Sequence, residues 1–334
     1  MKLSRFVATT AFGCLPLLPL FAFGADSGDV GPVKMISAME DAFGVHPGQR
    51  RNHIKGSCAL GEFTGLPAGA AYSRSKLFSG DTIPVTARFS VGGGNPAASD
   101  AAKGVRGMAL EFKLPGGAIQ HMTMINMPIF GAAKPQTFYD MLVALKPDPA
   151  THKPDPEAIK TFAASHPDYQ AMGDYAKSHN PPPSYANSPY YSLHAFWFVN
   201  KDNHKTLVRW HFEPQDGVKF MTDEQMQKAP ADFLEKVLID RTHKGPVKWD
   251  LVVTLGQEGD PQNDPSKPWP ADRKEVTLGT LAITQAMAQK GAACEPINFD
   301  PMVVADGIAV TDDPVLRARS AAYAVSFGKR LSGN

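Results

Sequence analysis

The chain has 334 residues, and its 34 lysines and arginines almost balance its 33 aspartates and glutamates. This balance gives no electrostatic reason to expect a nucleic-acid partner. Beyond the N-terminal region no stretch is long and apolar enough to span a bilayer, so stable membrane insertion is not expected.

The N-terminal region has the order of a secretory signal peptide. A short basic start precedes the almost wholly apolar stretch Phe6–Phe23, and small residues occupy the positions that a signal peptidase recognises before its cleavage site. Cys14 could suggest a lipoprotein site, but the apolar run continues beyond it. We therefore expect residues 1–24 to be a cleaved signal peptide, the mature chain to begin at Ala25, and the protein to be periplasmic.

Eight segments have the alternation and the β-branched or aromatic content of strands. In chain order they are Lys55–Gly65, Ile83–Val91, Arg106–Leu114, Ile119–Asn126, Ser192–Val199, Thr206–Glu213, Val247–Leu255 and Glu275–Thr284. Eight antiparallel strands in one domain favour a closed barrel, because closure removes the exposed edges. The expected fold class is α+β, an eight-stranded antiparallel β-barrel with flanking helices.

Helical patterns lie between these strands and at the C-terminus. The expected helices are Thr137–Ala144, Asp155–Lys177, Thr222–Leu238 and Pro314–Leu331, the last of which starts with proline in its first turn. Proline-rich links wrap between the elements, and too little chain lies beyond them to form a second core. We therefore expect a single domain over residues 25–334.

Two cysteines, Cys58 and Cys294, remain after the expected cleavage. An exported protein could pair them, but two separate buried thiols are an equally good interpretation. The sequence holds no CxxC metal knuckle and no HExxH helix.

The stretch QRRNHIKGSCALGEF places His53 in a strongly basic turn directly before the first expected strand. A histidine that only packs in a core would not need so much positive charge around it. If the imidazole works as a general base, something negative or electron-poor should lie nearby.

The strand TARFSV places Arg88 and Ser90 on one face and Phe89 on the other. An inward serine can accept a hydrogen bond from one ring nitrogen of a histidine, and an inward arginine can bind a carboxylate. The alternative is a barrel rim with one surface arginine.

The segment INMPIFG ends a strand with Asn126. An amide at this position could orient a small polar ligand, and Phe130 and Phe138 could wall a flat hydrophobic cofactor.

The final expected helix carries Arg319 and Tyr323 four residues apart, so that the two side chains share one face. A guanidinium beside a phenol favours the phenolate, which is an anionic oxygen ligand suited to ferric iron. Taken alone, a tyrosine on a terminal helix is more often an ordinary packing residue.

Six segments together resemble motifs of the haem catalases. RRNHIKG resembles R-x-x-H-A-K-G, ARFSV resembles the R-F-S strand, VRGMALEF resembles R-G-F-A-x-K-F, NMPIF resembles N-N-T-P-x-F, and INFDP with RARSAAY resembles F-D-P and R-x-x-x-Y. The six occur in the order of the family and span nearly the whole mature chain. This agreement in order is what makes the resemblance specific.

The resemblance implies a barrel that holds haem b. Tyr323 would be the proximal iron ligand, with Arg319 as its charge partner. His53 would be the distal base, oriented by Ser90, and would move a proton from the near to the far peroxide oxygen.

In the same resemblance Arg50 and Arg88 would contact the haem propionates.

Two features of the sequence differ from the large catalases. The chain stops soon after its last motif, as in the short exported catalase-related peroxidases. Alignment on Pro128 also sets Ile125, not Asn126, at the position of the functional asparagine.

The sequence thus predicts a periplasmic haem peroxidase that consumes hydrogen or organic peroxides with an external small-molecule electron donor. Two alternatives remain at this point. One is a true catalase that disproportionates hydrogen peroxide, and the other is a secreted haem-binding barrel without turnover. The sequence indicates neither a specific donor nor an oligomeric state.

Overall fold

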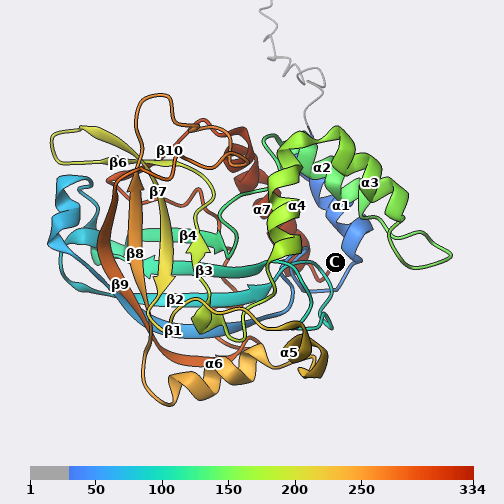
Figure 1. Ribbon diagram of the computed structural model, residues 1–334. Coiled ribbons are helices and arrows are strands. Elements are labelled where there is room, and N and C mark those ends of the chain that lie inside the picture. The colour runs from blue at the N-terminus through green and yellow to red at the C-terminus, as the bar shows by residue number, and fades with distance from the viewer. Residues whose placement is uncertain (1–29) are drawn as a thin grey trace, which may run out of the picture.

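The computed structural model describes residues 30–334 (Figure 1). The expected signal peptide, residues 1–24, and the expected mature start at Ala25 lie outside this range. Within residues 30–334 no helix combines the length and the apolar character needed to cross a membrane.

An eight-stranded antiparallel barrel forms the centre of the molecule and confirms the expected fold. Strand β1 pairs with β2 and β9, and the ring continues through β3, β4, β5, β7 and β8 until β8 pairs with β9. The bounds are β1 Gly56–Gly65, β2 Thr82–Val91, β3 Arg106–Lys113, β4 Ile119–Ile125, β5 Tyr190–Tyr191, β7 Lys205–Pro214, β8 Val247–Leu255 and β9 Glu275–Ala288.

One wall of the barrel is interrupted where the sequence predicts the continuous strand Ser192–Val199. The structure has two short strands there, β5 and β6 (Phe196–Val199), which pair with different parts of β7. Strand β10 (Ile308–Val310) extends the sheet beyond β6. At the break Leu193 has a φ of 63°, a left-handed conformation that is rare for a bulky residue. The interruption frees His194 from the strand pairing.

Aromatic side chains fill the inside of the barrel. Phe89 stacks against Trp249 with ring centroids 5.7 Å apart, and both are fully buried in the main hydrophobic cluster. Because neighbours on a strand alternate between faces, Arg88 and Ser90 point out of the barrel. Of the two interpretations of this strand, the inward one does not hold, because the large aromatic residue between Arg88 and Ser90 takes the core side.

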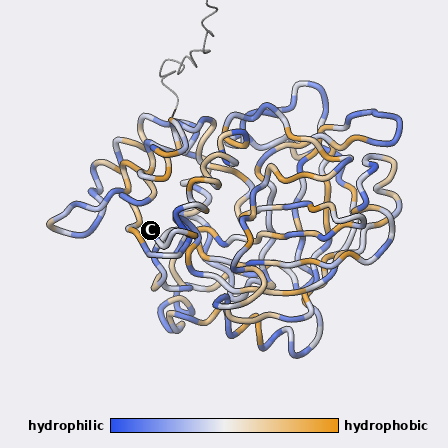
Figure 2. The backbone as a smooth tube through the Cα atoms, turned by 180° about the vertical axis from the view of Figure 1, so that it is seen from behind, coloured by the Kyte–Doolittle hydropathy of each residue, from blue (hydrophilic) through white to orange (hydrophobic). Residues whose placement is uncertain are grey.

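Helices gather on one side of the barrel (Figure 1). They are α1 Pro32–Phe43, α2 Pro135–Ala144, α3 Pro156–Ser165, α4 Pro167–Ser178 and α7 Pro314–Leu331, while α5 Asp223–Lys228 and α6 Leu234–Thr242 lie beneath the barrel. Short 3-10 turns complete the set: Pro67–Ala71, Lys76–Phe78, Pro115–Gly117 and Tyr185–Asn187. The view from behind shows that the outer loops are largely hydrophilic (Figure 2).

The helix predictions are confirmed in position but not always in continuity. The expected helix Asp155–Lys177 is two helices, because Pro167 begins α4 and cannot continue α3. The expected helix Thr222–Leu238 is likewise divided near Pro230. Helix α1 was not predicted, although Pro32 at its start and its buried apolar residues form a helical pattern.

The two cysteines form a disulfide bond. Cys58 on β1 and Cys294 in the segment after β9 have Cα atoms 5.5 Å apart, and both side chains are buried. Of the two interpretations that the sequence left open, the paired one is confirmed.

Candidate active site

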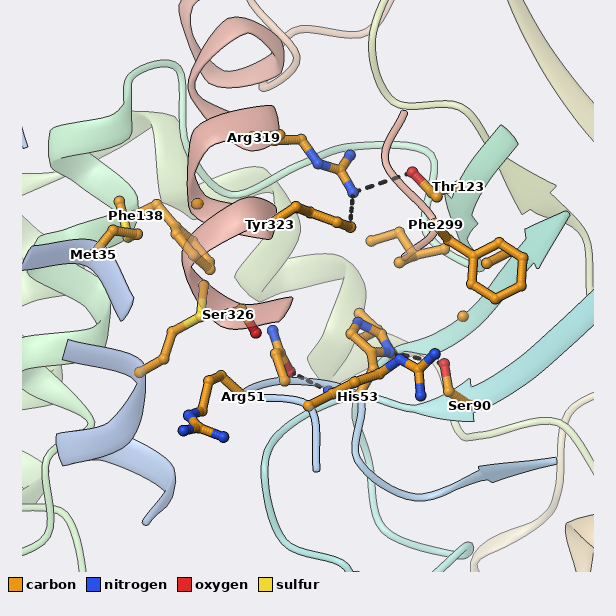
Figure 3. Close-up of a pocket in the computed structure, with 18 of the residues that line it drawn as sticks. Met35, Arg51, His53, Ser90, Thr123, Phe138, Phe299, Arg319, Tyr323 and Ser326 are labelled. Carbon is orange, nitrogen blue, oxygen red and sulfur yellow. Dashed lines mark hydrogen bonds between the residues drawn. The ribbon is translucent and has the colours of Figure 1, made fainter. Parts of the chain in front are cut away.

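A cavity of about 380 Å³ lies between the outer face of β2–β4 and helices α1, α2 and α7 (Figure 3). Ser90 of β2, Gly107 of β3 and Thr123 of β4 line the barrel side, and Arg319 and Tyr323 of α7 line the helix side. The site therefore lies outside the barrel, with the packed barrel as its rigid floor.

His53 reaches the cavity from the turn before β1. Its backbone is left-handed, with a φ of 54°. The Asn52 side chain holds this turn, because its Oδ1 accepts hydrogen bonds from the backbone N–H groups of His53 and Gly93, both at 2.8 Å. Asn52 was not among the predicted site residues, although asparagine before a turn is a recognisable signal.

The imidazole of His53 is oriented by Ser90. Nδ1 lies 3.0 Å from Ser90 Oγ, and Gly107, which is paired with Ser90 across β2 and β3, lies directly against both groups. Burial, followed by the positive charge of Arg88 and further arginines, lowers the pKa of His53 to about 3. The ring is therefore neutral near pH 7 and can accept a proton.

Tyr323 enters the cavity from the opposite side (Figure 3). Arg319, one helical turn earlier, donates a hydrogen bond of 2.7 Å from Nη2 to the phenolic oxygen. The same nitrogen lies 3.1 Å from Thr123 Oγ1, which fixes the guanidinium against β4. The predicted pair is thus present, with its hydroxyl directed into the cavity.

A buried pair behind Arg319 extends this arrangement. Arg319 Nη1 lies 3.2 Å from His194 Nε2, and His194 Nδ1 lies 2.7 Å from Asp313 Oδ2. A guanidinium only donates, so Nε2 of His194 accepts and its Nδ1–H donates to the carboxylate. Burial and the Arg319 charge lower the pKa of His194 despite Asp313. His194 and Asp313 were not predicted, because only the folded chain brings them together.

Arginine side chains gather at another part of the cavity. The predicted residues Arg50 and Arg88 are joined there by Arg330, which was not predicted although it follows Tyr323 by seven residues on the same helix face. Burial is the main cause that lowers the pKa of all three, and neighbouring guanidinium groups lower the pKa of Arg50 and Arg88 further.

None of these three guanidinium groups has a carboxylate partner within the described range. Their hydrogen bonds go to backbone carbonyls and to the amide of Gln289. The charge of Glu295 raises the pKa of Arg50 and Arg330 somewhat, against the larger effect of burial, but makes no ion pair with them, so an anion that joined the cluster would be stabilised. Carboxylate is a suitable anion, because a guanidinium binds it through two parallel hydrogen bonds.

Phe130 and Phe138 both line the cavity, and their ring centroids are 5.5 Å apart. The two rings can therefore form an apolar wall against a flat group. Asn126 does not line it. Its Oδ1 accepts a 2.7 Å hydrogen bond from the backbone N–H of Arg106, whereas the neighbouring Ile125 faces the cavity. The structure therefore leaves the predicted Asn126 apart from the other site residues.

These observations fit a haem group. The cavity combines an oxygen ligand at Tyr323, aromatic walls and an arginine cluster that no carboxylate pairs with directly and that could bind two carboxylates. Tyr323 would hold the iron, and Arg50, Arg88 and Arg330 would hold the propionates.

Comparisons with known proteins agree with this site. The family model described as Catalase matches residues 46–334. A catalase-related peroxidase of Synechococcus elongatus is 50% identical over 98% of this chain and 97% of its own length. A second catalase-related peroxidase, from Mycolicibacterium paratuberculosis, is 34% identical over 91% of this chain and 96% of its own.

Among solved structures, a bacterial catalase covers 86% of this chain with a TM-score of 0.78 at 24% identity, which supports the fold. The match takes in 58% of that longer chain. The chain therefore belongs to the catalase family, is similar over nearly its whole length to catalase-related peroxidases, and is an oxidoreductase that acts on peroxide.

Proposed function

We propose that the protein is a haem b peroxidase that reduces organic peroxides and hydrogen peroxide with an external small-molecule electron donor. The observation that carries this proposal is the composition of the wall around His53. His53 is a neutral acid–base group held by Ser90, and Ile125, which the resemblance to the haem catalases sets at the position of their functional asparagine, lines the same cavity.

His53 moves the proton in this proposal. Nδ1 donates to Ser90 Oγ, so Nε2 keeps its lone pair and accepts the proton of the near peroxide oxygen. The resulting imidazolium returns the proton to the far oxygen as the O–O bond breaks. General acid–base catalysis of this kind contributes about 10²–10⁴-fold.

Haem, when bound, supplies the iron that receives peroxide and passes oxidising equivalents to the donor. Tyr323 would hold that iron through its phenolic oxygen, which accepts a hydrogen bond from the Arg319 guanidinium. Arg319 is in turn held by His194 and Thr123, so the ligand side is rigid.

The apolar helix side of the cavity supports organic peroxides as substrates. Met35 and Met39 of α1, Met141 of α2 and Met172 of α4 line it. Flexible thioether side chains adapt to apolar groups of varied shape.

The test compares oxygen release from hydrogen peroxide with oxidation of an aromatic donor by an alkyl hydroperoxide. We expect donor oxidation to dominate, and to fall at least about 100-fold in His53→Ala. His204→Ala, at an exposed histidine outside the cavity, is the matched control. Ile125→Asn should raise the share of oxygen release.

Vigorous oxygen release without donor oxidation would instead identify a true catalase. Undiminished donor oxidation by His53→Ala would exclude His53 from the mechanism and leave a haem-binding barrel with incidental chemistry.

We also propose that the chain is exported to the periplasm after cleavage of residues 1–24. The basic, apolar and small-residue order of that segment supports this, as does the Cys58–Cys294 disulfide, because such bonds persist mainly in oxidising compartments. Mass spectrometry of the protein from its native cell envelope should find a start at or near Ala25. An intact Met1 in a soluble cytoplasmic fraction would contradict export.

A further inference from the structure

The segment Gln289–Ile297 contacts every member of the arginine cluster. Gln289 Oε1 accepts a 2.6 Å hydrogen bond from Arg88 Nε. Arg50 Nη2 donates to the carbonyls of residues 294, 295 and 297, at 3.3, 3.2 and 2.9 Å. Arg330 Nη2 donates to the carbonyl of residue 296 at 3.2 Å. One short stretch of chain therefore orients all three guanidinium groups.

This segment has neither helix nor strand to hold it in shape. Its covalent anchor is the disulfide, through which Cys294 is tied to Cys58 on the barrel. Cys58 stands directly opposite Arg88 in the pairing of β1 with β2, and the carbonyl of Cys294 accepts from Arg50. The two ends of the disulfide thus lie beside two of the arginines.

We propose that the Cys58–Cys294 disulfide is a positioning device for the carboxylate-binding arginines. It holds segment Gln289–Ile297 in the shape that aims Arg50, Arg88 and Arg330 at the haem propionates. The inference rests on the proposed haem function, because the arginines need a dicarboxylate ligand. The disulfide holds the Cα atoms of Cys58 and Cys294 5.5 Å apart, so the segment cannot move away from the barrel at residue 294.

The physical reason is the mobility of free arginine side chains. A guanidinium held by carbonyls is already in position, and binding a carboxylate then costs little further side-chain entropy. Without the disulfide the carbonyls of the segment would spread over many positions, and each arginine would have to be ordered again when haem binds. Removal of the disulfide should therefore increase the rate at which haem dissociates.

The experiment measures haem release to excess apomyoglobin from the wild type and from Cys58→Ala/Cys294→Ala. Each protein is loaded in parallel with haem and with haem dimethyl ester, which lacks the carboxylates. We expect the double variant to release haem at least about tenfold faster, as the weakening of one charge-assisted hydrogen bond would give. Release of the ester should differ less than about twofold between the two proteins.

Two further variants separate this effect from a general loss of stability. Leu238→Ala removes a buried side chain of α6 that does not line the cavity, so it lowers stability without touching the arginines. It should leave the ratio of haem to ester release unchanged. Gln289→Ala keeps the disulfide, removes the side-chain acceptor of Arg88 Nε, and should speed release of haem but not of the ester. The Gln289→Ala variant still tests the inference if the double variant does not fold.

Equal haem release from wild type and double variant would overturn the inference, and so would an equal acceleration of haem and ester. No effect of Gln289→Ala on haem release would also count against it. A wild-type protein that binds no haem would instead refute the proposed function itself, so the two failures are distinguishable.

Discussion

Gly107→Ala should disable the proposed general base without altering any charged or hydrogen-bonding side chain. A Cβ atom at this position would lie 2.6 Å from Ser90 Oγ and 3.0 Å from His53 Nδ1. Cβ atoms essentially never approach another heavy atom closer than 3.0 Å. The new methyl group would therefore push against both ends of the His53–Ser90 hydrogen bond.

The size of the effect follows from this geometry. Ser90 has to retreat by at least about 0.4 Å to reach the 3.0 Å limit, and the imidazole has to turn with it or lose its partner. A misplacement of about 1 Å costs on the order of 100-fold in rate, so we expect kcat/KM for peroxide to fall about 10- to 100-fold. Overpacking should also cost about 1–3 kcal/mol of stability.

The assay is steady-state donor oxidation at limiting peroxide, normalised to bound haem, with thermal unfolding measured in parallel. Gly328→Ala on α7 is the matched control, since a Cβ there meets nothing within 4 Å. It should keep full activity and gain slightly in stability. A Gly107→Ala protein that is fully loaded and fully active would refute the idea that the His53–Ser90 contact orients the base.

Three further predictions concern Tyr323, His53 and Asp313. Tyr323→Phe should preserve the fold but abolish the high-spin ferric spectrum, and unchanged absorption bands would remove Tyr323 as ligand. Because burial and Arg88 lower the pKa of His53 from 6.5 to about 3, the unfolded state binds more protons between these values. Stability should therefore fall as the pH falls through that window, less steeply in His53→Gln, and equal slopes in urea unfolding would contradict this. Asp313→Ala removes the partner of His194 and a hydrogen bond to the Val315 N–H at the start of α7. It should cost about 2 kcal/mol or more in urea unfolding, whereas a cost below about 0.5 kcal/mol would refute this role.

The regular elements could be predicted because their signals are local. The helix Pro314–Leu331 is observed with the predicted bounds, since Pro314 can only begin a helix and the apolar pattern continues to its end. The strands around Arg88 follow the period of two. The sequence left open which face of β2 points into the core, although Phe89 between two polar residues indicates the core side.

Other features depend on contacts between distant parts of the chain. His194 leaves the strand ladder to meet Asp313, which is 119 residues away, and no window around either residue contains that information. Arg330 is different, because its seven-residue distance from Tyr323 on one helix places it on the same face and could have been used. The contacts of segment Gln289–Ile297 with Arg50 and Arg330 are made by backbone carbonyls, which carry no sequence signal.

Helix α7 carries Arg319, Tyr323, Ser326 and Arg330 in a single stripe along the cavity. Each residue added to a helix rotates everything after it by about 100°. An insertion or deletion of one residue between Arg319 and Arg330 would turn the proposed iron ligand or the proposed propionate contact away from the others, even if every side chain were kept. This stretch of α7 should therefore accept substitutions on its outer face but no change in length. The site depends on the spacing of these residues as much as on their identity.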